Sequence, residues 1–272
     1  MKQPIKLGLL GKQLSHSLSP EIHNFLLKKQ GFIGDYQTYA LNEQELPYVL
    51  SKMANENILG LNVTIPYKET LFQMVDHLDE HARAIGAINT IHFKDGITYG
   101  YNTDYLGVIG MFKKAHVTLK GKDITILGSG GAAKALVYAF QQEKAKHITV
   151  AARNQEACLA LQRLFPYIHI CDFSHITKGD LIVNTTPVGM FPHVANSPVD
   201  RNVLTQFAIA GDIVYNPFLT KFLTLAKKEG LTIVTGLMML VDQAIAAEEI
   251  WLGKQIDDTL GNEIHDRLKG RF

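Results

Sequence analysis

The sequence predicts an α/β protein of two domains. The first observation is an aliphatic run, Asp123–Leu127, that ends at glycines with the spacing G-x-G-x-x-A and is followed at once by a helical run. The second is another aliphatic run, at 147–152, that begins one helix length later. Together they form a strand–helix–strand unit of about 30 residues. This order is typical of a doubly wound, Rossmann-type sheet that binds a dinucleotide.

The residues of this turn have separate physical roles. Gly128 supplies the tight turn, Gly130 lets the backbone approach a pyrophosphate, and Ala133 lets the helix pack closely on the strand. The helix N-terminus then offers unpaired N–H groups and the positive end of its dipole to phosphates. A glycine turn in an α/β domain without a nucleotide is the alternative that this motif alone leaves open.

Composition and charge limit the class of protein. Hydrophobic residues make up 46% and charged residues 19% of the chain, which is the balance of a globular protein with an ample core. The net charge of +1 provides no basic field for nucleic acid or a membrane surface, and no apolar run approaches the roughly 20 residues of a membrane span. The spacing of Cys158 and Cys171 favours free thiols in a reducing compartment. We therefore expect a cytoplasmic protein.

The first domain is expected to open with a strand and to alternate strands and helices. Ser19 is the expected N-cap of its first helix, with Pro20 at the first helical position, and Pro66 ends the third strand. Lys94-Asp-Gly96 is the expected turn of a hairpin. Strands are expected over 5–10, 36–40, 58–64, 87–93 and 97–101, and helices over 19–29, 43–54 and 79–85.

A helix over 105–115 is expected to lead into the glycine-turn domain, and two amphipathic helices, 237–251 and 257–269, are expected to return to the first domain. Strands of the glycine-turn domain are expected near 124–127, 148–151, 181–184, 213–215 and 231–234. The predicted boundaries are therefore residues 1–104 with 237–272 for a substrate-binding, catalytic domain, and 105–236 for the dinucleotide-binding domain. Ligands of such folds lie beyond the carboxyl ends of the strands.

The residues after the second nucleotide-domain strand favour NADP over NAD. An NAD site usually has Asp or Glu here to accept a hydrogen bond from the ribose 2′-hydroxyl, whereas this chain has Ala151-Ala-Arg-Asn154. Arg153 can pair with a 2′-phosphate through a charge-assisted, bidentate contact. The alternative is an exposed arginine that opens the next helix.

Polar residues gather where apolar runs of the first domain end, in a pattern that suits a small polyhydroxylated ligand. These stretches are Ser17–Ser19, Asn62–Lys68, Asn89–Thr90 and Asn102–Asp104. Reduction of a ketone by hydride requires a proton donor at the nascent alkoxide, and Lys68 with Asp104 is the best pair for that work. Taken singly, Lys68 is as easily a solvated surface lysine and Asp104 a helix N-cap.

Taken in order along the chain, these stretches resemble the motifs of the shikimate dehydrogenase family. The motifs are Ser15-His-Ser-Leu-Ser-Pro20, Asn62-Val-Thr-Ile-Pro-Tyr-Lys68, Gly86-Ala-Ile-Asn-Thr90, Gly100-Tyr-Asn-Thr-Asp104, Gly128-Ser-Gly-Gly-Ala132, Asn184-Thr-Thr-Pro187, Tyr215-Asn-Pro217 and Gly236-Leu-Met-Met-Leu-Val-Asp-Gln-Ala244. The resemblance implies reversible, NADPH-dependent reduction of 3-dehydroshikimate to shikimate, in the pathway to chorismate and the aromatic amino acids. The net charge of +1 favours no nucleic-acid or membrane partner, and together with the resemblance it leads us to expect a small-molecule enzyme that is a monomer or a homodimer.

The resemblance also implies roles for individual residues. Lys68 and Asp104 form the catalytic pair. Ser17 and Ser19 hold the substrate carboxylate, and Tyr215 closes off that side. The hydroxyls of the substrate are reached by Thr64, Asn89 and Gln243. The pyrophosphate of NADP is cradled by Gly128, Ser129, Gly130, Gly131 and Ala132. Arg153, flanked by Ala152 and Asn154, binds the 2′-phosphate. The nicotinamide is flanked by Ile213, Gly236 and Met239.

The chain departs from the family pattern at two places. The family commonly has Asn-Arg-Thr where this chain has Ala152-Arg-Asn154, and Asn-Pro where it has Lys12-Gln13. The alternative within the enzyme class is a quinate/shikimate dehydrogenase that uses NAD, or a paralogue that acts on a shikimate analogue. The alternative outside it is a catalytically silent nucleotide-binding regulator, against which the presence of both Lys68 and Asp104 argues.

Overall fold

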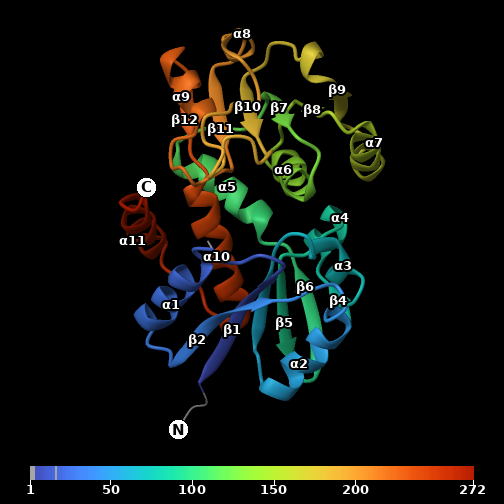
Figure 1. Cartoon of the computed structure of the whole chain (residues 1–272), viewed down its shortest axis with the longest axis vertical. Helices are drawn as coiled ribbons and strands as arrows, with labels where there is room; N and C mark the ends of the chain where they lie inside the picture. The colour runs from blue at the N-terminus through green and yellow to red at the C-terminus, as the bar shows by residue number, and fades with distance from the viewer. Residues whose placement is uncertain (1–3, 16) are drawn as a thin grey trace. The chain divides into compact units, whose positions relative to one another are not determined.

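The computed structural model describes residues 4–15 and 17–272 and divides the chain into two compact units (Figure 1). Unit 1 consists of Met1–Thr103 with Gln243–Ile264, and unit 2 of Asp104–Asp242 with His265–Phe272. Each unit is built on its own six-stranded sheet. In the described part of the chain, no helix has both the length and the apolar character needed to span a bilayer.

The sheet of unit 1 has the strand order β2-β1-β3-β5-β6-β4. Strands β2, β1 and β3 run parallel, β5 runs antiparallel to both β3 and β6, and β4 runs parallel to β6. The strands are β1 (Ile5–Gly11), β2 (Gly34–Ala40), β3 (Gly60–Val63), β4 (His77–Leu78), β5 (Thr90–Lys94) and β6 (Ile97–Tyr101). The helices before the crossing into unit 2 are α1 (Ser19–Lys29), α2 (Val49–Glu56), α3 (Lys68–Phe72) and α4 (Glu80–Ile85).

Strand β1 shows how the sheet buries both faces. Successive side chains of a strand point to opposite faces, so Leu7 and Leu9 pack in one cluster and Leu10 in another. The first cluster includes Trp251 of helix α10 (Leu237–Leu252), and the second includes residues of α2 and β3. Parallel strands covered on both faces explain why this part of the sequence is continuously apolar.

The hairpin of unit 1 confirms the turn that the sequence predicts. Strand β5 ends at Lys94 and β6 begins at Ile97, so Asp95 and Gly96 form a two-residue loop. Their φ angles are 52° and 81°. Positive φ at both central positions is the type I′ geometry that Asp-Gly favours, because its twist matches that of the two strands.

Two local predictions for unit 1 are wrong, and two short elements were missed. The N-cap of α1 is Leu18, and the Ser17 Oγ accepts the hydrogen bond from the Ser19 N–H at 3.2 Å. The helix expected over 43–54 is instead a turn, a 3₁₀ segment (Leu46–Tyr48) and α2, because Asn42 Oδ1 accepts from the Gln44 N–H at 3.0 Å and holds the turn. The short elements α3 and β4 were not expected.

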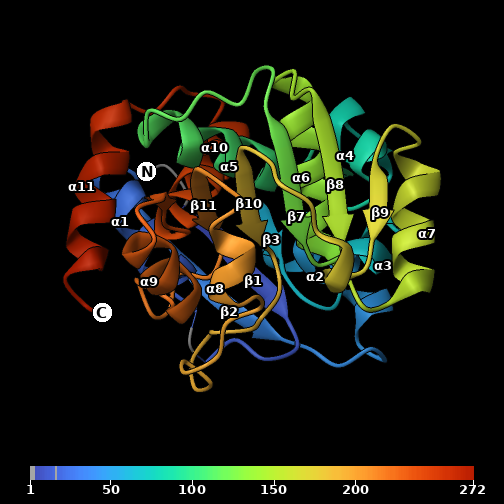
Figure 2. The same cartoon turned by 90° about the horizontal axis from the view of Figure 1, so that it is seen from above.

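The sheet of unit 2 is parallel throughout, with the order β12-β11-β10-β7-β8-β9. Counted within the unit this is 6-5-4-1-2-3, the doubly wound order of a dinucleotide-binding fold. The strands are β7 (Asp123–Leu127), β8 (His147–Ala151), β9 (His169–Cys171), β10 (Leu181–Asn184), β11 (Ile209–Asp212) and β12 (Thr232–Val234). Figure 2 shows β7, β8 and β9 side by side.

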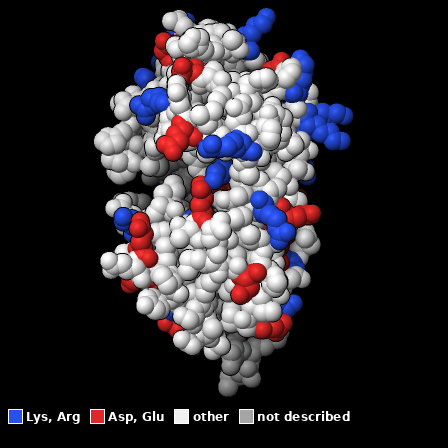
Figure 3. Space-filling model, turned by 90° about the vertical axis from the view of Figure 1, so that its right-hand side faces the viewer, with Lys and Arg blue, Asp and Glu red and all other residues white. Residues whose placement is uncertain are grey.

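The helices of unit 2 connect these strands. On the molecular face shown in Figure 3, acidic and basic residues lie interspersed. The helices are α5 (Asp104–Lys114), α6 (Gly131–Gln142), α7 (Gln155–Leu164), α8 (Arg201–Leu204) and α9 (Lys221–Lys228). Helix α10 begins in this unit, and α11 (Asp258–Lys269) is the last helix of the chain.

The strand expected near 213–215 is wrong by several residues, since β11 ends at Asp212. The Asp212 Oδ1 accepts from the Val214 N–H at 3.0 Å, so this backbone donor bonds to a side chain instead of a neighbouring strand. Strand β9 was not expected, because its three residues carry a weak pattern.

Helix α10 is anchored on the unit 1 sheet by Trp251. The indole Nε1–H donates to the Ile91 carbonyl at 2.9 Å, and the side chain is 4% exposed. A Cβ atom at Gly60 would collide with this indole ring. The absence of a side chain at Gly60 is therefore what allows the helix to seat on β3.

We expect Gly60→Ala to lower the free energy of unfolding by about 1–3 kcal/mol, because the indole is held by its hydrogen bond and the core must shift. Urea denaturation of parent and variant measures the change. Gly270→Ala is the control, since a Cβ there meets only the Arg267 carbonyl, at 3.7 Å. Equal stability of the two variants would contradict this account of the packing.

Candidate functional site

A buried network of polar side chains lies at the ends of the central strands of unit 1. Asn62 on β3 donates from Nδ2 to the Thr90 Oγ1 at 3.1 Å, and Thr90 donates to the Asn89 Oδ1 at 3.0 Å. The Thr103 N–H donates to the same oxygen at 2.6 Å. All four side chains are buried. The network thus satisfies amides that would be costly to bury unpaired.

The structure brings together two of the predicted substrate-binding residues, Asn89 and Gln243. The Asn89 Nδ2 donates to the Gln243 Oε1 at 3.4 Å, although the two residues lie 154 positions apart in the chain. Gln243 is carried by α10 and is 9% exposed. The bond assigns the oxygen of Gln243 to Asn89.

Ser17 and Ser19 lie at the start of α1. Ser19 is the first residue of the helix and is buried, whereas Ser17 is partly exposed. Their mutual hydrogen bond, from the Ser19 N–H to the Ser17 Oγ, holds the two hydroxyl-bearing residues in one turn of the chain. Unit 1 therefore contains both of the serine hydroxyls that are expected to bind the substrate carboxylate.

Thr64 and Lys68 flank the turn between β3 and α3. The Thr64 N–H donates to the Leu10 carbonyl at 2.9 Å, and the Lys68 carbonyl accepts from the Ile88 N–H at 3.1 Å. Between them, Tyr67 is 1% exposed and its hydroxyl donates to the Leu41 carbonyl at 2.6 Å. Lys68 therefore extends from a backbone that is fixed on both sides, next to the residue that precedes Asn89.

Asp104 is the first residue of α5 and is 8% exposed. It follows Thr103, whose N–H is bonded to Asn89, by one peptide bond. Lys68 belongs to unit 1 and Asp104 to unit 2. Their pairing stays a prediction.

The glycine turn of unit 2 joins β7 to α6, and the backbone conformation of its first residue favours glycine. Gly128 has φ 110°, and its N–H donates to the Ala151 carbonyl at 2.8 Å. Only glycine adopts this conformation readily. Gly130 is the N-cap of the 12-residue helix α6, and a Cβ built at Gly130 or Gly131 meets no described atom within 4 Å. The first turn of α6 is therefore open to a ligand.

The turn lies at the topological switch point of the sheet. Strand β7 pairs with β8 on one side and β10 on the other, so the loops that follow β7 and β10 diverge here. The Thr185 hydroxyl, just after β10, donates to the Leu127 carbonyl at 2.8 Å. This bond ties the two loops at the carboxyl end of the strands.

The residues after β8 differ in their surroundings. Ala152 is buried and Arg153 is exposed, while the Asn154 Oδ1 accepts from the Ala157 N–H at 3.0 Å and caps α7. A surface cavity of about 200 Å³ adjoins them, lined by Ala152, Gln155, Cys158, Leu159, Ile170, Cys171 and Asp172. Asn154 uses its side-chain oxygen for this cap. Its predicted contact with the cofactor must therefore come from its other polar groups.

The residues predicted at the nicotinamide lie around the end of β11. The Ile213 N–H donates to the Asn184 carbonyl at 3.1 Å, and Gly236 approaches the backbone of Ile213 so closely that a Cβ would collide with it. Met239 lies on the first turn of α10 and is 8% exposed. Tyr215 stacks edge-on with Phe272, with ring centroids 6.4 Å apart, and burial raises its pKa.

Asp212 organises this region, although no sequence motif pointed to it. Its Oδ1 accepts from the Asn184 Nδ2 at 3.0 Å and from the Val214 N–H, and its Oδ2 accepts from the Thr220 hydroxyl at 2.7 Å. The residue is fully buried, and burial raises the pKa of its carboxyl to about 7 in spite of these donors. A carboxyl group at the end of an apolar strand is the signal that would have identified it.

Comparison with known proteins covers nearly the whole chain. A family model described as the shikimate dehydrogenase substrate binding domain matches residues 9–91. A protein of Clostridium perfringens named shikimate dehydrogenase (NADP(+)) is 40% identical over 267 residues, which is 97% of this chain and 98% of that protein.

Solved structures show the same likeness. A chorismate mutase/shikimate 5-dehydrogenase fusion protein from Clostridium acetobutylicum is 37% identical, with a TM-score of 0.94 over 99% of both chains. Shikimate 5-dehydrogenase from Thermus thermophilus, in complex with NADP(H) and shikimate, is 32% identical, with a TM-score of 0.89 over 97% of this chain and 99% of that chain.

The raised pKa of Asp212 predicts a pH dependence of stability. An aspartate in an unfolded chain has a pKa of about 3.9, so the folded state binds this proton more tightly. The resulting stabilisation is full below that value and is lost as the pH rises through about 7. From pH 5 to pH 8 the parent should therefore lose about 2–3 kcal/mol more of its free energy of unfolding than Asp212→Asn, whose side chain stays neutral.

Urea denaturation of both proteins at the two pH values measures this difference. The other titrating groups are common to parent and variant, so their contributions cancel in the comparison. An identical pH dependence of the two proteins would show that Asp212 does not carry the raised pKa.

Proposed function

Because the chain belongs to the shikimate dehydrogenase family, we propose that it catalyses the reversible, NADP-dependent reduction of 3-dehydroshikimate to shikimate, a step in the biosynthesis of chorismate and the aromatic amino acids. The observation that carries the proposal is 40% identity to a shikimate dehydrogenase (NADP(+)) across 97% of the chain, which includes both units. The protein is an oxidoreductase that acts on a CH–OH group.

We assign one task to each predicted domain. Residues 1–104 with 237–272 bind the substrate, which the family match over 9–91 supports. Residues 105–236 bind NADP, which the parallel sheet and the glycine turn support. The compact units of the structure divide the chain at 103/104, 242/243 and 264/265, so helices α10 and α11 each contribute to both units.

The residues present fit NADP. The open first turn of α6, formed with Gly128, Ser129, Gly130, Gly131 and Ala132, suits a pyrophosphate, because the N–H groups and the helix dipole favour negative charge there. Exposed Arg153, with Ala152 and Asn154 beside it, suits a 2′-phosphate. Ile213, Gly236 and Met239 are assigned to the nicotinamide.

Lys68 and Asp104 are assigned to the proton transfer. When bound, NADPH supplies the hydride that is added to the ketone carbon. Lys68 donates a proton to the carbonyl oxygen as charge develops there, and Asp104 orients the lysine ammonium group. In the oxidative direction, the same lysine accepts the proton of the hydroxyl.

The remaining assigned residues hold the substrate. Ser17 and Ser19 donate to its carboxylate, which Tyr215 closes off, and Thr64, Asn89 and Gln243 bind its hydroxyls. The Asn89–Gln243 contact supports the shared role of that pair. Several hydrogen bonds made together discriminate strongly, because an analogue without one hydroxyl leaves a buried amide unpaired.

We further propose a cytoplasmic enzyme that acts as a monomer or a homodimer. Cys158 and Cys171 are both free thiols, as is usual for a protein of a reducing compartment.

The proposal is tested by following the absorbance of the reduced nicotinamide, with shikimate and quinate each offered with NADP and with NAD. We expect turnover of shikimate with NADP. Turnover of quinate with NAD alone would move the protein to a quinate dehydrogenase, and silence in all four assays would refute the proposed reaction.

Lys68→Ala should lower kcat by about 10²–10⁴-fold, because it removes the group that transfers the proton. Its Kd for NADPH, measured by fluorescence titration, should stay that of the parent. Lys28→Ala, an exposed lysine on α1, is the control for loss of one charge. A kcat like that of the control would remove Lys68 from the reaction.

Arg153→Ala should raise the Kd of NADPH by about 10–100-fold and leave that of NADH nearly unchanged, because a hydrogen-bonded charge pair with the 2′-phosphate is lost. Fluorescence titration with each cofactor measures both constants. Arg163→Ala, an exposed arginine at the other end of α7, is the matched control. Equal losses for the two cofactors would mean that Arg153 does not contact the 2′-phosphate.

A further inference from the structure

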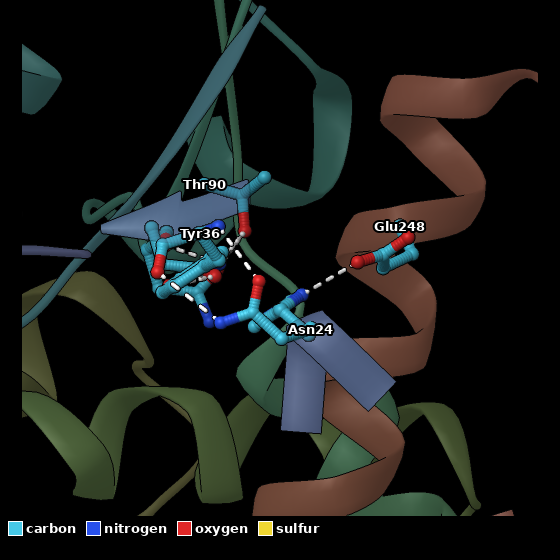
Figure 4. A network of polar contacts seen from close by, with 7 residues as sticks. Asn24, Tyr36, Thr90 and Glu248 are labelled. Atoms are coloured by element: carbon cyan, nitrogen blue, oxygen red, sulfur yellow. Dashed lines mark hydrogen bonds and ion pairs between the residues drawn. The ribbon is translucent and has the colours of Figure 1, made fainter. Parts of the chain in front are cut away.

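Unit 1 also contains a buried histidine–carboxylate pair. His23 of α1 and Glu248 of α10 are joined by a hydrogen bond of 2.9 Å between Nδ1 and Oε1. Both side chains are 0% exposed. Figure 4 shows Glu248 on its helix, with a dashed contact toward the group of sticks that contains Tyr36 and Thr90. None of the substrate or cofactor roles above uses this pair.

The pair fixes the ring of Tyr36. The rings of His23 and Tyr36 stack with centroids 4.1 Å apart and an angle of 1° between their planes. The indole of Trp251 lies against the His23 ring at 5.5 Å. Because Glu248 holds the Nδ1 edge and the Tyr36 ring lies parallel to the imidazole, the two rings fix each other's orientation.

The Tyr36 hydroxyl begins a directed chain of hydrogen bonds. It donates to the Asn62 Oδ1 at 2.8 Å, which leaves the Asn62 Nδ2 to donate to the Thr90 Oγ1. Thr90 then donates to the Asn89 Oδ1, and the Asn89 Nδ2 donates to the Gln243 Oε1. An amide has one acceptor end and one donor end, so the bonds at both ends fix its orientation. For Asn89 they include the Thr103 N–H, which donates to Oδ1 at 2.6 Å, and the Thr103 Oγ1, which accepts from Nδ2 at 3.0 Å.

The direction of this chain depends on Tyr36 being a donor. Burial and the nearby Glu248 carboxylate raise the pKa of Tyr36 well above its ordinary value, so the hydroxyl keeps its proton. Tyr36 is therefore linked, through the chain, to two residues assigned to the substrate hydroxyls.

We propose that Tyr36, held by the His23–Glu248 pair, is a positioning residue for the substrate: through Asn62 and Thr90 its hydroxyl tightens the ladder that, together with Thr103, holds the Asn89 and Gln243 amides. The proposal rests on the substrate-binding roles proposed for Asn89 and Gln243. A buried ionisable pair adds little net stability, since desolvation offsets the attraction between its members. Its effect lies in the geometry that it imposes.

Tyr36→Phe tests the proposal, because it keeps the stacked ring and removes only the hydroxyl. Without this donor Asn62 loses a hydrogen bond at Oδ1, although its Nδ2 still donates to the Asn89 carbonyl at 3.3 Å and to the Thr90 Oγ1. The ladder that ends at the Asn89 and Gln243 amides is therefore loosened at its first member. We expect the KM for shikimate to rise about tenfold, with kcat and the KM for NADP within about twofold of the parent. Steady-state assays, with a thermal melt as the folding check, measure these values.

Tyr39→Phe is the matched control, because it makes the same substitution on the same strand, β2. Its side chain packs in the cluster on the other face of the sheet. We expect its KM values to equal those of the parent. An equal rise in the KM for shikimate in both variants would overturn the proposal, and so would an effect of Tyr36→Phe confined to kcat.

The pair is tested separately at Glu248. Glu248→Gln keeps an oxygen that accepts from His23 and should retain the parental KM for shikimate, whereas Glu248→Leu should raise it about as much as Tyr36→Phe. Lys29→Met removes a surface ion pair, with Glu263 at 2.7 Å, from the same helix as His23 and should change nothing. Equal KM values for the Gln and Leu variants would overturn the role of the pair.

A measurement without turnover separates this inference from the proposed function. In the full-length parent, NMR follows hydrogen exchange of the Asn89 and Gln243 side-chain amides, and we expect exchange about tenfold faster in Tyr36→Phe but not in Tyr39→Phe. A parent that fails to oxidise shikimate would refute the proposed function while this comparison still decides the relay. Unchanged exchange in Tyr36→Phe would overturn the relay whatever the activity.

Discussion

The interior of unit 1 depends on one constraint: amide side chains buried at strand ends must have every donor and acceptor placed. Asn62 and Asn89 are 4% and 2% exposed, and an unpaired amide at that depth costs about 1–3 kcal/mol. The chain meets the constraint with a ladder of side chains, Tyr36, Thr90 and Thr103 among them, that join β2, β3 and β5 to the residue before α5. A ladder that satisfies each amide in only one orientation also fixes which atoms face a ligand.

Unit 2 meets a comparable demand with a carboxyl group. Asp212 gathers Asn184 from the neighbouring strand, Thr220 from the start of the next helix and the Val214 N–H. Burial outweighs these donors and raises the pKa of its carboxyl to about 7. By turning the chain after β11, it also brings the backbone of Ile213 against Gly236, where a nicotinamide is assigned.

The sequence predicts the structure well where the chemistry is local. The glycine turn, the Asp95-Gly96 hairpin and the strand–helix order follow from the conformations that a few adjacent residues can adopt. The predictions are wrong where a side chain redirects the backbone, as at Asp212 and Asn42, and at the N-cap of α1. No sequence pattern indicates the His23–Glu248 pair, because 225 residues separate partners that only tertiary packing brings together.

The assigned substrate contacts differ in what they require of the fold. Asn89 and Gln243 both belong to unit 1, so the contact between them is complete within one compact body. Lys68 and Asp104 are drawn from different units, and Asp104 is the first residue after the chain leaves the network at Thr103. The hydroxyl-binding role proposed for Asn89 and Gln243 therefore uses groups that one compact body already holds, which lowers the entropy cost of binding. The proposed proton-transfer pair takes one residue from each unit, so a variant of the network should change substrate affinity before it changes the chemical step.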